Sequence, residues 1–185
     1  MIIDTERLIL RDWREHDRAP FTAMSADPAV MQFLRALPTR EACDQWIDVQ
    51  IAHQAEHGFG FWVVEGRTSG AFLGTVGLFR VLFDAPFTPA VEIGWRLARE
   101  AWGQGIATEA ARAALDFGFA RLKLDEIIAY AAPANEASQQ VMRKLGMIRD
   151  AASDFDHPRV SADSPLRRQV MYRLARDAWA KSEMP

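Results

Sequence analysis

The segment that most constrains the fold is a glycine-containing loop between an apolar run and a long helical pattern. Val91–Leu97 before the loop is strand-like, and Thr108–Leu122 after it is rich in alanine. Gly103 and Gly105 lack the Cβ atoms that would keep a ligand away from the backbone. The first amides of a helix have no acceptor within the helix, so they are free to bind an anion. The order strand, glycine loop, helix therefore predicts a site for a diphosphate group.

Two common nucleotide-binding loops do not fit this segment. A P-loop needs a Lys after its second Gly, and none follows Gly105; a dinucleotide fingerprint needs a third Gly where Thr108 stands. The small residues Gly105 and Ala107 instead resemble the pyrophosphate motif of the GNAT superfamily of N-acetyltransferases, Gln/Arg-x-x-Gly-x-Gly/Ala. The resemblance implies ligand contacts, mainly through backbone amides, along Trp102, Gly103, Gln104, Gly105, Ile106, Ala107 and Thr108. Trp102 stands where the family has Gln or Arg.

A second segment supports the resemblance. Glu126–Ala132 is expected to be a strand that ends at Pro133, and Asn135 is a good residue to cap a helix. The apolar residues that follow recur with helical spacing at Ala137, Val141 and Leu145. A strand, an Asn, a helix and then Lys-Leu-Gly resemble the second conserved part of the same superfamily.

Both ends of the chain resemble one branch of that superfamily. Thr5–Arg11 is similar to the opening strand of the ribosomal-protein-alanine acetyltransferases, often called RimJ/RimL-like, and Arg167–Leu174 is similar to their last strand. The resemblance runs over about residues 5–174. It implies one α/β (α+β) domain over residues 1–185, in which a twisted, mixed and largely antiparallel sheet of about six or seven strands is flanked by helices. The sheet is expected to splay between strands four and five.

The remaining elements follow from periodicity and turn residues. We expect helices over Asp27–Leu34 and Thr39–His57, and strands over Gly60–Glu65 and Phe72–Leu82. Ser153–Pro165 is polar, contains two prolines and is expected to be a loop. A short helix is expected over residues 176–181.

Composition limits the kinds of partner. With 185 residues and 49% hydrophobic content, the chain can form the core of one domain. The net charge is −3 and no Lys/Arg-rich stripe is present, so we do not expect nucleic acid as a partner. No apolar run approaches the roughly 20 residues of a membrane span, and no secretory signal follows Met1. Cys43 is expected to be buried in the core. A cytoplasmic protein without a metal ion is therefore expected.

The resemblance also implies a cosubstrate, acetyl-CoA, and residues that hold it. The backbone of Trp95, Arg96 and Leu97 would bind the pantetheine arm, and the side chain of Asn135 would touch the same arm. An amine then attacks the thioester carbonyl and the thiolate leaves. The acceptor is expected to bind near Asp27–His57 and Ser153–Pro165.

Transfer to a protonated amine requires a base. Glu92, three residues before Trp95, is the first candidate, since several GNAT relatives carry a base there; the alternative is an ordinary solvent-facing strand residue. His157 is the second candidate, because an unperturbed imidazole has a pKa of about 6.5.

The leaving thiolate accepts a proton in many GNAT enzymes from a Tyr seven residues after the Asn. Met142 occupies that position here and cannot donate. In the RimJ/RimL-like branch a Ser three residues after the Asn is the substitute, which is Ser138; alternatively, Ser138 only bonds locally at the start of the helix. A thiol with a pKa of about 8.5 can also leave unaided.

Three functions remain open at this point. The first is acetyl-CoA-dependent transfer of an acetyl group to a primary amine, on a protein N-terminus or a small molecule. The second is a catalytically silent acyl-CoA-binding sensor or scaffold, and the third is a nucleotide enzyme that uses the same loop. Dimers occur among the relatives, so a homodimer is compatible with each of them.

Overall fold

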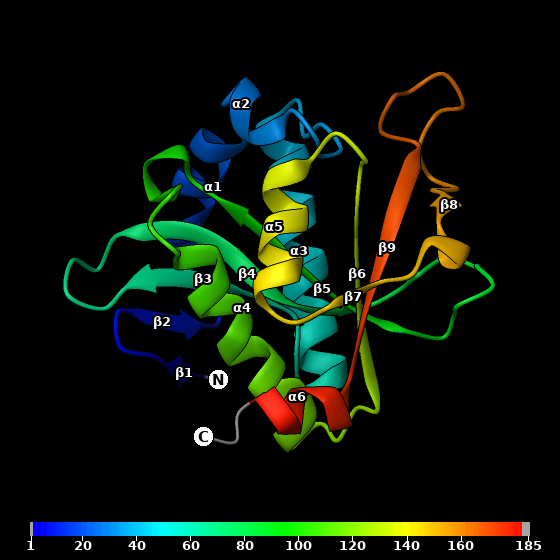
Figure 1. Ribbon diagram of the computed structural model, residues 1–185. Coiled ribbons are helices and arrows are strands. Elements are labelled where there is room, and N and C mark those ends of the chain that lie inside the picture. The colour runs from blue at the N-terminus through cyan, green and yellow to red at the C-terminus, as the bar shows by residue number, and fades with distance from the viewer. Residues whose placement is uncertain (1, 183–185) are drawn as a thin grey trace. The chain divides into compact units, whose positions relative to one another are not determined.

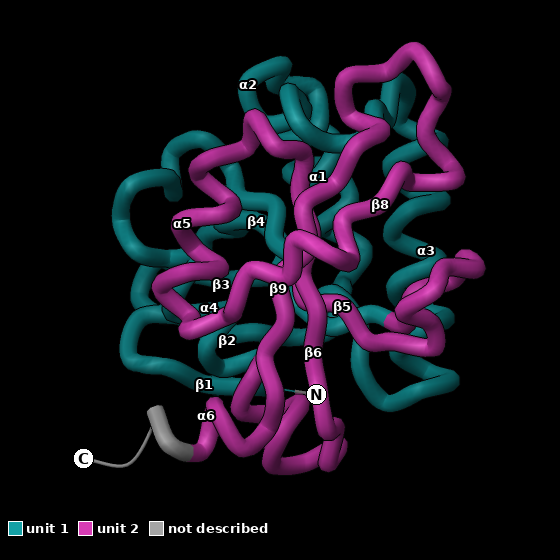
Figure 2. The backbone as a smooth tube through the Cα atoms, turned by 45° about the vertical axis from the view of Figure 1, so that its right-hand side comes forward, with its two compact units in different colours: residues 1–79, 94–114 teal, residues 80–93, 115–185 magenta. Residues whose placement is uncertain are grey.

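The computed structural model describes residues 2–182, which belong to two compact units (Figures 1 and 2). Unit 1 comprises Met1–Phe79 and Gly94–Ala114, and unit 2 comprises Arg80–Ile93 and Leu115–Pro185. Strand β5 (Val91–Leu97) contributes to both units. One domain over residues 1–185 stays a prediction.

Unit 1 contains an antiparallel series of strands. These are β1 (Ile2–Asp4), β2 (Leu8–Arg11), β3 (Phe61–Gly66) and β4 (Phe72–Arg80), paired in this order, and the later residues of β5 follow β4. Gly77 allows β4 to pack closely, because a Cβ atom there would lie 2.1 Å from the carbonyl oxygen of Gly60.

Several helix ends of unit 1 lie at residues that the sequence marks. They are α1 (Arg18–Ser25), α2 (Pro28–Met31), α3 (Arg40–His57) and most of α4 (Ile106–Asp116). Asp27 caps α2 by accepting a hydrogen bond from the N–H of Ala29, and Thr39 caps α3 in the same way. Gly58 ends α3 with a left-handed φ of 77°. Helix α1 was not predicted from the sequence. The predicted helix over Asp27–Leu34 is longer than α2, because α2 has one turn and little periodicity.

An aromatic core joins these helices to the strands of unit 1. Its buried residues come from the segment after β2, from α1, α2 and α3, and from β3; they are Trp13, Phe21, Met24, Val30, Cys43, Ile47 and Val63. Cys43 is buried, as expected. Beside this core, the buried Arg11 forms a two-pronged ion pair with Asp17, with N–O distances of 2.7 and 2.8 Å.

Unit 2 is built around two long antiparallel strands. They are β6 (Glu126–Ala131) and β9 (Arg168–Ala175), and the short strands β7 (Ile148–Arg149) and β8 (Phe155–Asp156) also pair with β9. The start of β5 pairs with β6 in parallel, at Glu92 and Ile128.

The helical segments of unit 2 are short. They are the π-helical turn η3 (Phe117–Arg121), α5 (Glu136–Lys144), the 3-10 turn η4 (Ala151–Ser153) and α6 (Arg176–Ser182). Between residues 2 and 182, no helix has the length and apolar character needed to cross a membrane.

The fold class predicted from the sequence is confirmed, since the structure is a mixed, mostly antiparallel sheet flanked by helices. Nine strands lie within residues 2–182, and the short strands β1 and β8 are the two beyond the expected seven. The expected loop Ser153–Pro165 is wrong at its start, where η4 and β8 lie. The expected splay in the sheet stays a prediction.

Candidate active site

The glycine loop of unit 1 has a backbone that only glycine adopts without strain. Gly103 and Gly105 have φ angles of 72° and 78°, in the left-handed region. No atom lies within 4 Å of a Cβ built on Gly103, and the nearest to one on Gly105 is an Arg7 nitrogen at 3.5 Å. Both glycines are exposed. A ligand could therefore approach this backbone directly.

The amides of this loop are available as donors. Among the described residues, none accepts a hydrogen bond from the backbone N–H groups of Gly103 to Thr108. Glu109 is the first residue whose N–H bonds back into the chain, to the carbonyl of Gly105 at 3.0 Å. Each bond from such an amide to a charged group contributes about 1.5–3 kcal/mol. The loop thus fits a diphosphate, because several donors point out at one helix N-terminus.

The N-terminal segment with Thr5 and Arg7, about 100 residues away in sequence, holds the loop in place. The hydroxyl of Thr5 donates to the Glu109 carboxylate at 2.6 Å, and the backbone N–H of Arg7 donates to it at 3.0 Å. The guanidinium of Arg7 bonds Glu109 at 2.6 Å and the carbonyl of Gln104 at 3.0 Å. Partial burial opposes ionisation of Glu109, but the bonds from Thr5 and Arg7 outweigh it and hold its pKa below the usual value. Residues 5–11 and the glycine loop both carry the resemblance to the superfamily, but this connection between them could not be predicted from the sequence.

The side chain of Trp102 also stabilises the shape of the glycine loop. Its indole N–H donates to the carbonyl of Leu97 at 3.0 Å, although the side chain is 45% exposed. The Gln104 side chain bonds the carbonyl of Glu100 at 2.5 Å. The indole N–H is therefore engaged within the chain, and phosphate contacts at Trp102 and Gln104 would come from the backbone.

The three β5 residues expected beside the pantetheine arm differ in their side chains. Leu97 is buried, whereas Trp95 and Arg96 are partly exposed. The guanidinium carbon of Arg96 lies 5.3 Å from the ring centroid of Phe21 and 5.1 Å from that of Trp46. Contacts from their backbone to a ligand stay a prediction.

Glu92, in unit 2, has an altered acidity. Burial raises the pKa of its carboxyl to about 7, and a hydrogen bond from Tyr130 opposes part of this rise. Burial and the charge of Glu92 raise the pKa of Tyr130 well above its usual value, so Tyr130 stays a hydrogen-bond donor. A carboxylate with this pKa can take up a proton near neutral pH. Glu92 is thus not an ordinary solvent-facing strand residue.

His157 lies in an aromatic cluster of unit 2 that also contains Tyr130. Its ring centroid is 4.6 Å from that of Phe83 and 6.1 Å from those of Tyr130 and Phe155. Its Nδ1 accepts a hydrogen bond from the N–H of Arg159 at 3.2 Å, which leaves Nε2 as the protonated nitrogen. Glu92 and His157, the two candidate bases, therefore both lie next to Tyr130, which was not among the site residues predicted from the sequence.

Asn135 and Ser138 form the start of α5. The side-chain oxygen of Asn135 accepts a hydrogen bond from the N–H of Ser138 at 3.2 Å, which is a helix cap. Met142 is 2% exposed and fills the core of unit 2. Capping uses only the oxygen of Asn135, so a contact between its amide group and a ligand stays a prediction, as does a proton-donating role for Ser138.

The predicted site residues are divided between the units. The glycine loop and residues 95–97 belong to unit 1, whereas Glu92, Asn135, Ser138 and His157 belong to unit 2. In the part of the chain that the structure describes, no group of three or more His, Cys, Asp or Glu side chains could hold a metal ion.

Comparison with known proteins identifies the family. Residues 7–148 match the family described as "Acetyltransferase (GNAT) domain". The chain is 33% identical to the Bacillus subtilis protein YkkB over 144 residues, 77% of this chain and 83% of that protein. It is 29% identical over 184 residues to the FsC-acetyl coenzyme A-N(2)-transacetylase of Aspergillus fumigatus, with 92% of this chain and 74% of that enzyme covered.

Solved structures agree with this assignment at the level of the fold. A GNAT-family acetyltransferase from Bacillus anthracis superposes with a TM-score of 0.78 at 24% identity, and 96% of this chain and 99% of that chain are covered. Ribosomal-protein acetyltransferases from two Vibrio species share the fold at 19% and 20% identity. At these identities the structures show the fold alone, and the superfamily rests on the family match over residues 7–148 and on the sequence relatives. The protein is an acyltransferase, and its chain belongs to the GNAT acetyltransferase family.

Proposed function

We propose that the protein transfers an acetyl group from acetyl-CoA directly to a primary amine. The row of available amides from Gly103 to Thr108 carries this proposal, because it suits the diphosphate of CoA. Family membership supports it, since GNAT acetyltransferases use acetyl-CoA as cosubstrate. The name of the Aspergillus fumigatus relative includes the same cosubstrate.

Binding is proposed to use three parts of the chain. The glycine loop binds the diphosphate, the backbone of Trp95, Arg96 and Leu97 binds the pantetheine arm, and the amide of Asn135 binds the same arm. When bound, acetyl-CoA supplies an activated acetyl group with a thiolate as leaving group. Trp102 and Arg7 act indirectly, because their hydrogen bonds fix the shape of the loop.

Glu92 is proposed as the base that takes the proton of the attacking amine, directly or through water. Its pKa of about 7 suits this task better than that of an ordinary carboxylate, since a base works best when its pKa is near the working pH. Tyr130 orients the carboxylate by its hydrogen bond. His157, whose ring centroid lies 6.1 Å from that of Tyr130, is the second candidate for this role.

Protonation of the leaving thiolate is proposed to involve Ser138 or no protein group. Met142 replaces the Tyr of many GNAT enzymes, and its buried position removes it from this chemistry. The same replacement is the observation that favours the second candidate function, an acyl-CoA-binding sensor without turnover. We also propose membership of the RimJ/RimL-like branch, a cytoplasmic location and compatibility with a homodimer.

The test is thiol release from acetyl-CoA in the presence of a panel of amines and peptide N-termini. Acetyl transfer predicts release that depends on both the protein and an amine. Tight binding of acetyl-CoA with no release for any amine would favour the sensor. Release that ATP or NAD suppresses as strongly as CoA would contradict a loop built for CoA.

A further inference from the structure

Arg96 is a cation enclosed by aromatic rings without an acidic partner. Phe21 and Trp46, which stack with ring centroids 4.8 Å apart, both lie against its guanidinium. Among the described residues no Asp or Glu forms an ion pair with it, and burial lowers its pKa to about 10. Arg96 is partly exposed, but its Nε is buried, and a charge enclosed in this way without an anion is costly for a fold, so a partner from outside the chain would stabilise it.

Some hydrogen-bond donors of the Arg96 guanidinium also lack an acceptor in the part of the chain that the structure describes. Its Nε is buried and has no hydrogen-bond partner within the described chain. One terminal nitrogen lies 3.4 Å from the hydroxyl oxygen of Ser25. Because Arg96 can only donate, Ser25 accepts in this contact, and its own hydroxyl hydrogen is left to donate elsewhere.

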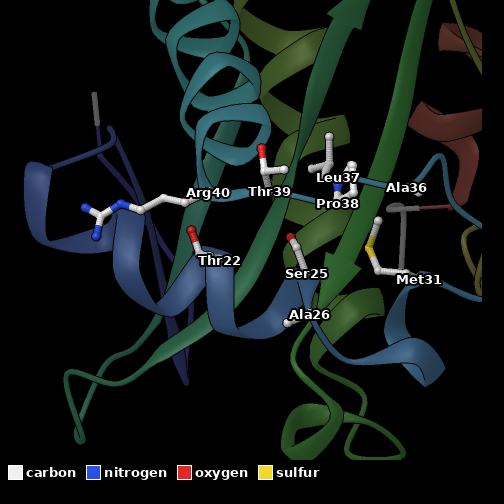
Figure 3. A pocket seen from close by; sticks show the side chains of 9 residues that line it. All are labelled: Thr22, Ser25, Ala26, Met31, Ala36, Leu37, Pro38, Thr39 and Arg40. Atoms are coloured by element: carbon white, nitrogen blue, oxygen red, sulfur yellow. The ribbon is translucent and has the colours of Figure 1, made fainter.

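Ser25 lines a cavity of about 320 Å³ in unit 1, between α1, α2 and residues 36–40 (Figure 3). We call this cavity the Ser25 pocket. Thr22, one turn earlier on α1, also lines it, and the buried hydroxyl of Thr22 has no partner among residues 2–182. In Figure 3 both hydroxyls point from α1 toward the segment that carries Thr39.

The rest of the lining explains why the ligand would be small and partly apolar. Met31, Leu37 and Pro38 form an apolar wall, and Arg40 also lines the pocket, although its guanidinium points away from it and pairs with Asp44 (Figure 3). Of the acidic residues nearest in sequence to this lining, Asp27 caps α2 and Asp44 pairs with Arg18 and Arg40. Glu41 is exposed and accepts a hydrogen bond from the hydroxyl of Thr39. A volume of about 320 Å³ is at the low end of the range of ligand pockets. The pocket therefore has room for a molecule the size of an amino acid.

We propose that the Ser25 pocket binds the carboxylate of a small acceptor, an amino carboxylate, through the hydroxyls of Thr22 and Ser25, with Arg96 behind Ser25 as the countercharge. The guanidinium of Arg96 lacks an anion within residues 2–182, and the hydroxyls of Thr22 and Ser25 can each donate a hydrogen bond, so together these groups favour a ligand that accepts hydrogen bonds and carries negative charge. This inference rests on the proposed acetyl transfer for the role of the ligand as acceptor, but not for the chemistry of the pocket.

The first experiment measures binding without turnover. The full chain is titrated with 4-methylpentanoate, which has no amine, and with the neutral 4-methylpentanamide, and thermal unfolding is followed. The carboxylate is expected to raise the melting temperature, and the amide is expected to have no effect. Ser25→Ala and Thr22→Val should each weaken carboxylate binding about tenfold, since each removes a hydrogen bond to a charged group. Arg121→Gln, which removes an exposed cation elsewhere, should leave binding unchanged.

The second experiment measures thiol release from acetyl-CoA with matched acceptors, L-leucine against L-leucinamide. Selective transfer to the acid, lost in Ser25→Ala, supports the inference. Equal transfer to both acceptors, or transfer to peptide N-termini alone, overturns it and leaves acetyl transfer standing. Carboxylate binding that depends on Ser25, without thiol release for any amine, supports the pocket and contradicts the proposed function. Carboxylate binding that survives Ser25→Ala also overturns the inference.

Discussion

The carboxyl group of Glu92 titrates near neutral pH because it is buried, and Tyr130 is the residue that moderates this effect. The hydrogen bond from Tyr130 stabilises the ionised form of Glu92, whereas burial disfavours it more strongly. Since a base must be ionised to accept a proton, the proposed reaction should slow as the pH falls through about 7.

Replacement of Glu92 with Gln tests its role as base. The acetyl-transfer rate is expected to fall by about 10²- to 10⁴-fold, which is the usual contribution of a general base. The affinity for acetyl-CoA should not change, because the carboxylate is assigned no contact with the cosubstrate. Rates from a thiol-release assay and affinities from calorimetry check this; a fully active variant would assign the role to another group, with His157→Gln as the next variant.

The same variant also reports on the folding equilibrium. A raised carboxyl pKa in the folded state contributes stability that is present below the unfolded pKa and is lost as the pH rises toward about 7. Glu92→Gln should therefore be more stable than the parent at pH 8 by about 1–3 kcal/mol, and this gain should shrink by pH 5. Denaturant unfolding at the two pH values is the measurement, and equal differences at both would contradict the assigned pKa.

Replacement of Tyr130 with Phe tests the positioning of Glu92. Loss of the hydrogen bond removes an interaction that favours the ionised form, so the pKa of Glu92 should rise further. The lower limb of the pH profile of kcat/KM should move to higher pH by about one unit. A lower rate with an unmoved profile would mean that Tyr130 supports only the fold.

At the scale of elements, the connection between the N-terminal segment and α4 preorganises the glycine loop. Thr5 and Arg7 precede β2, and Glu109 lies in the first turns of α4. The carboxylate of Glu109 accepts bonds from both residues, and Arg7 also bonds the loop carbonyl of Gln104. Because exposed ion pairs contribute little to stability, we expect the main effect of this connection on loop geometry rather than on folding.

Replacement of Glu109 with Gln is expected to weaken acetyl-CoA binding about five- to tenfold, with little loss of thermal stability. The physical reason is that Gln keeps the size of the side chain but loses the charge that holds Arg7. Glu100→Gln is the matched control, because the side chain of Glu100 is exposed close to the loop. Calorimetric titration of both variants checks this, and equal affinities would show that the loop does not depend on Glu109.

Elements with strong local signals could be predicted from the sequence, and elements defined by distant contacts could not. Asp27, Thr39, Gly58 and Asn135 mark helix ends through their own backbone or side-chain chemistry, and each does so in the structure. Strand β8 has only two residues, so it shows no periodicity from which a strand could be predicted. The surroundings of Arg96 come from α1 and α3, which lie about 40–80 residues earlier in the chain, and no local pattern encodes that contact.

At the scale of the whole molecule, β5 is the strand that belongs to both units. Glu92 lies in the part of β5 assigned to unit 2, and Arg96 lies in the part assigned to unit 1. The family could be predicted from the order of the motifs along the chain. The surroundings of Glu92 and Arg96, which determine the chemistry of these side chains, could be seen only in the structure. The glycine loop follows this strand after the short 3-10 turn Arg99–Ala101. The central claim is that this loop binds the diphosphate of acetyl-CoA.

The most direct test of that claim is calorimetric titration of acetyl-CoA into the parent protein, Gly105→Leu and Gly70→Leu. The two glycines have similar left-handed φ angles of 78° and 65°, so both variants carry similar backbone strain. Gly70 lies in the turn between β3 and β4 with open space around it. We predict that Gly105→Leu abolishes binding while Gly70→Leu binds like the parent. Unchanged affinity in Gly105→Leu would contradict the assignment of the loop to the diphosphate.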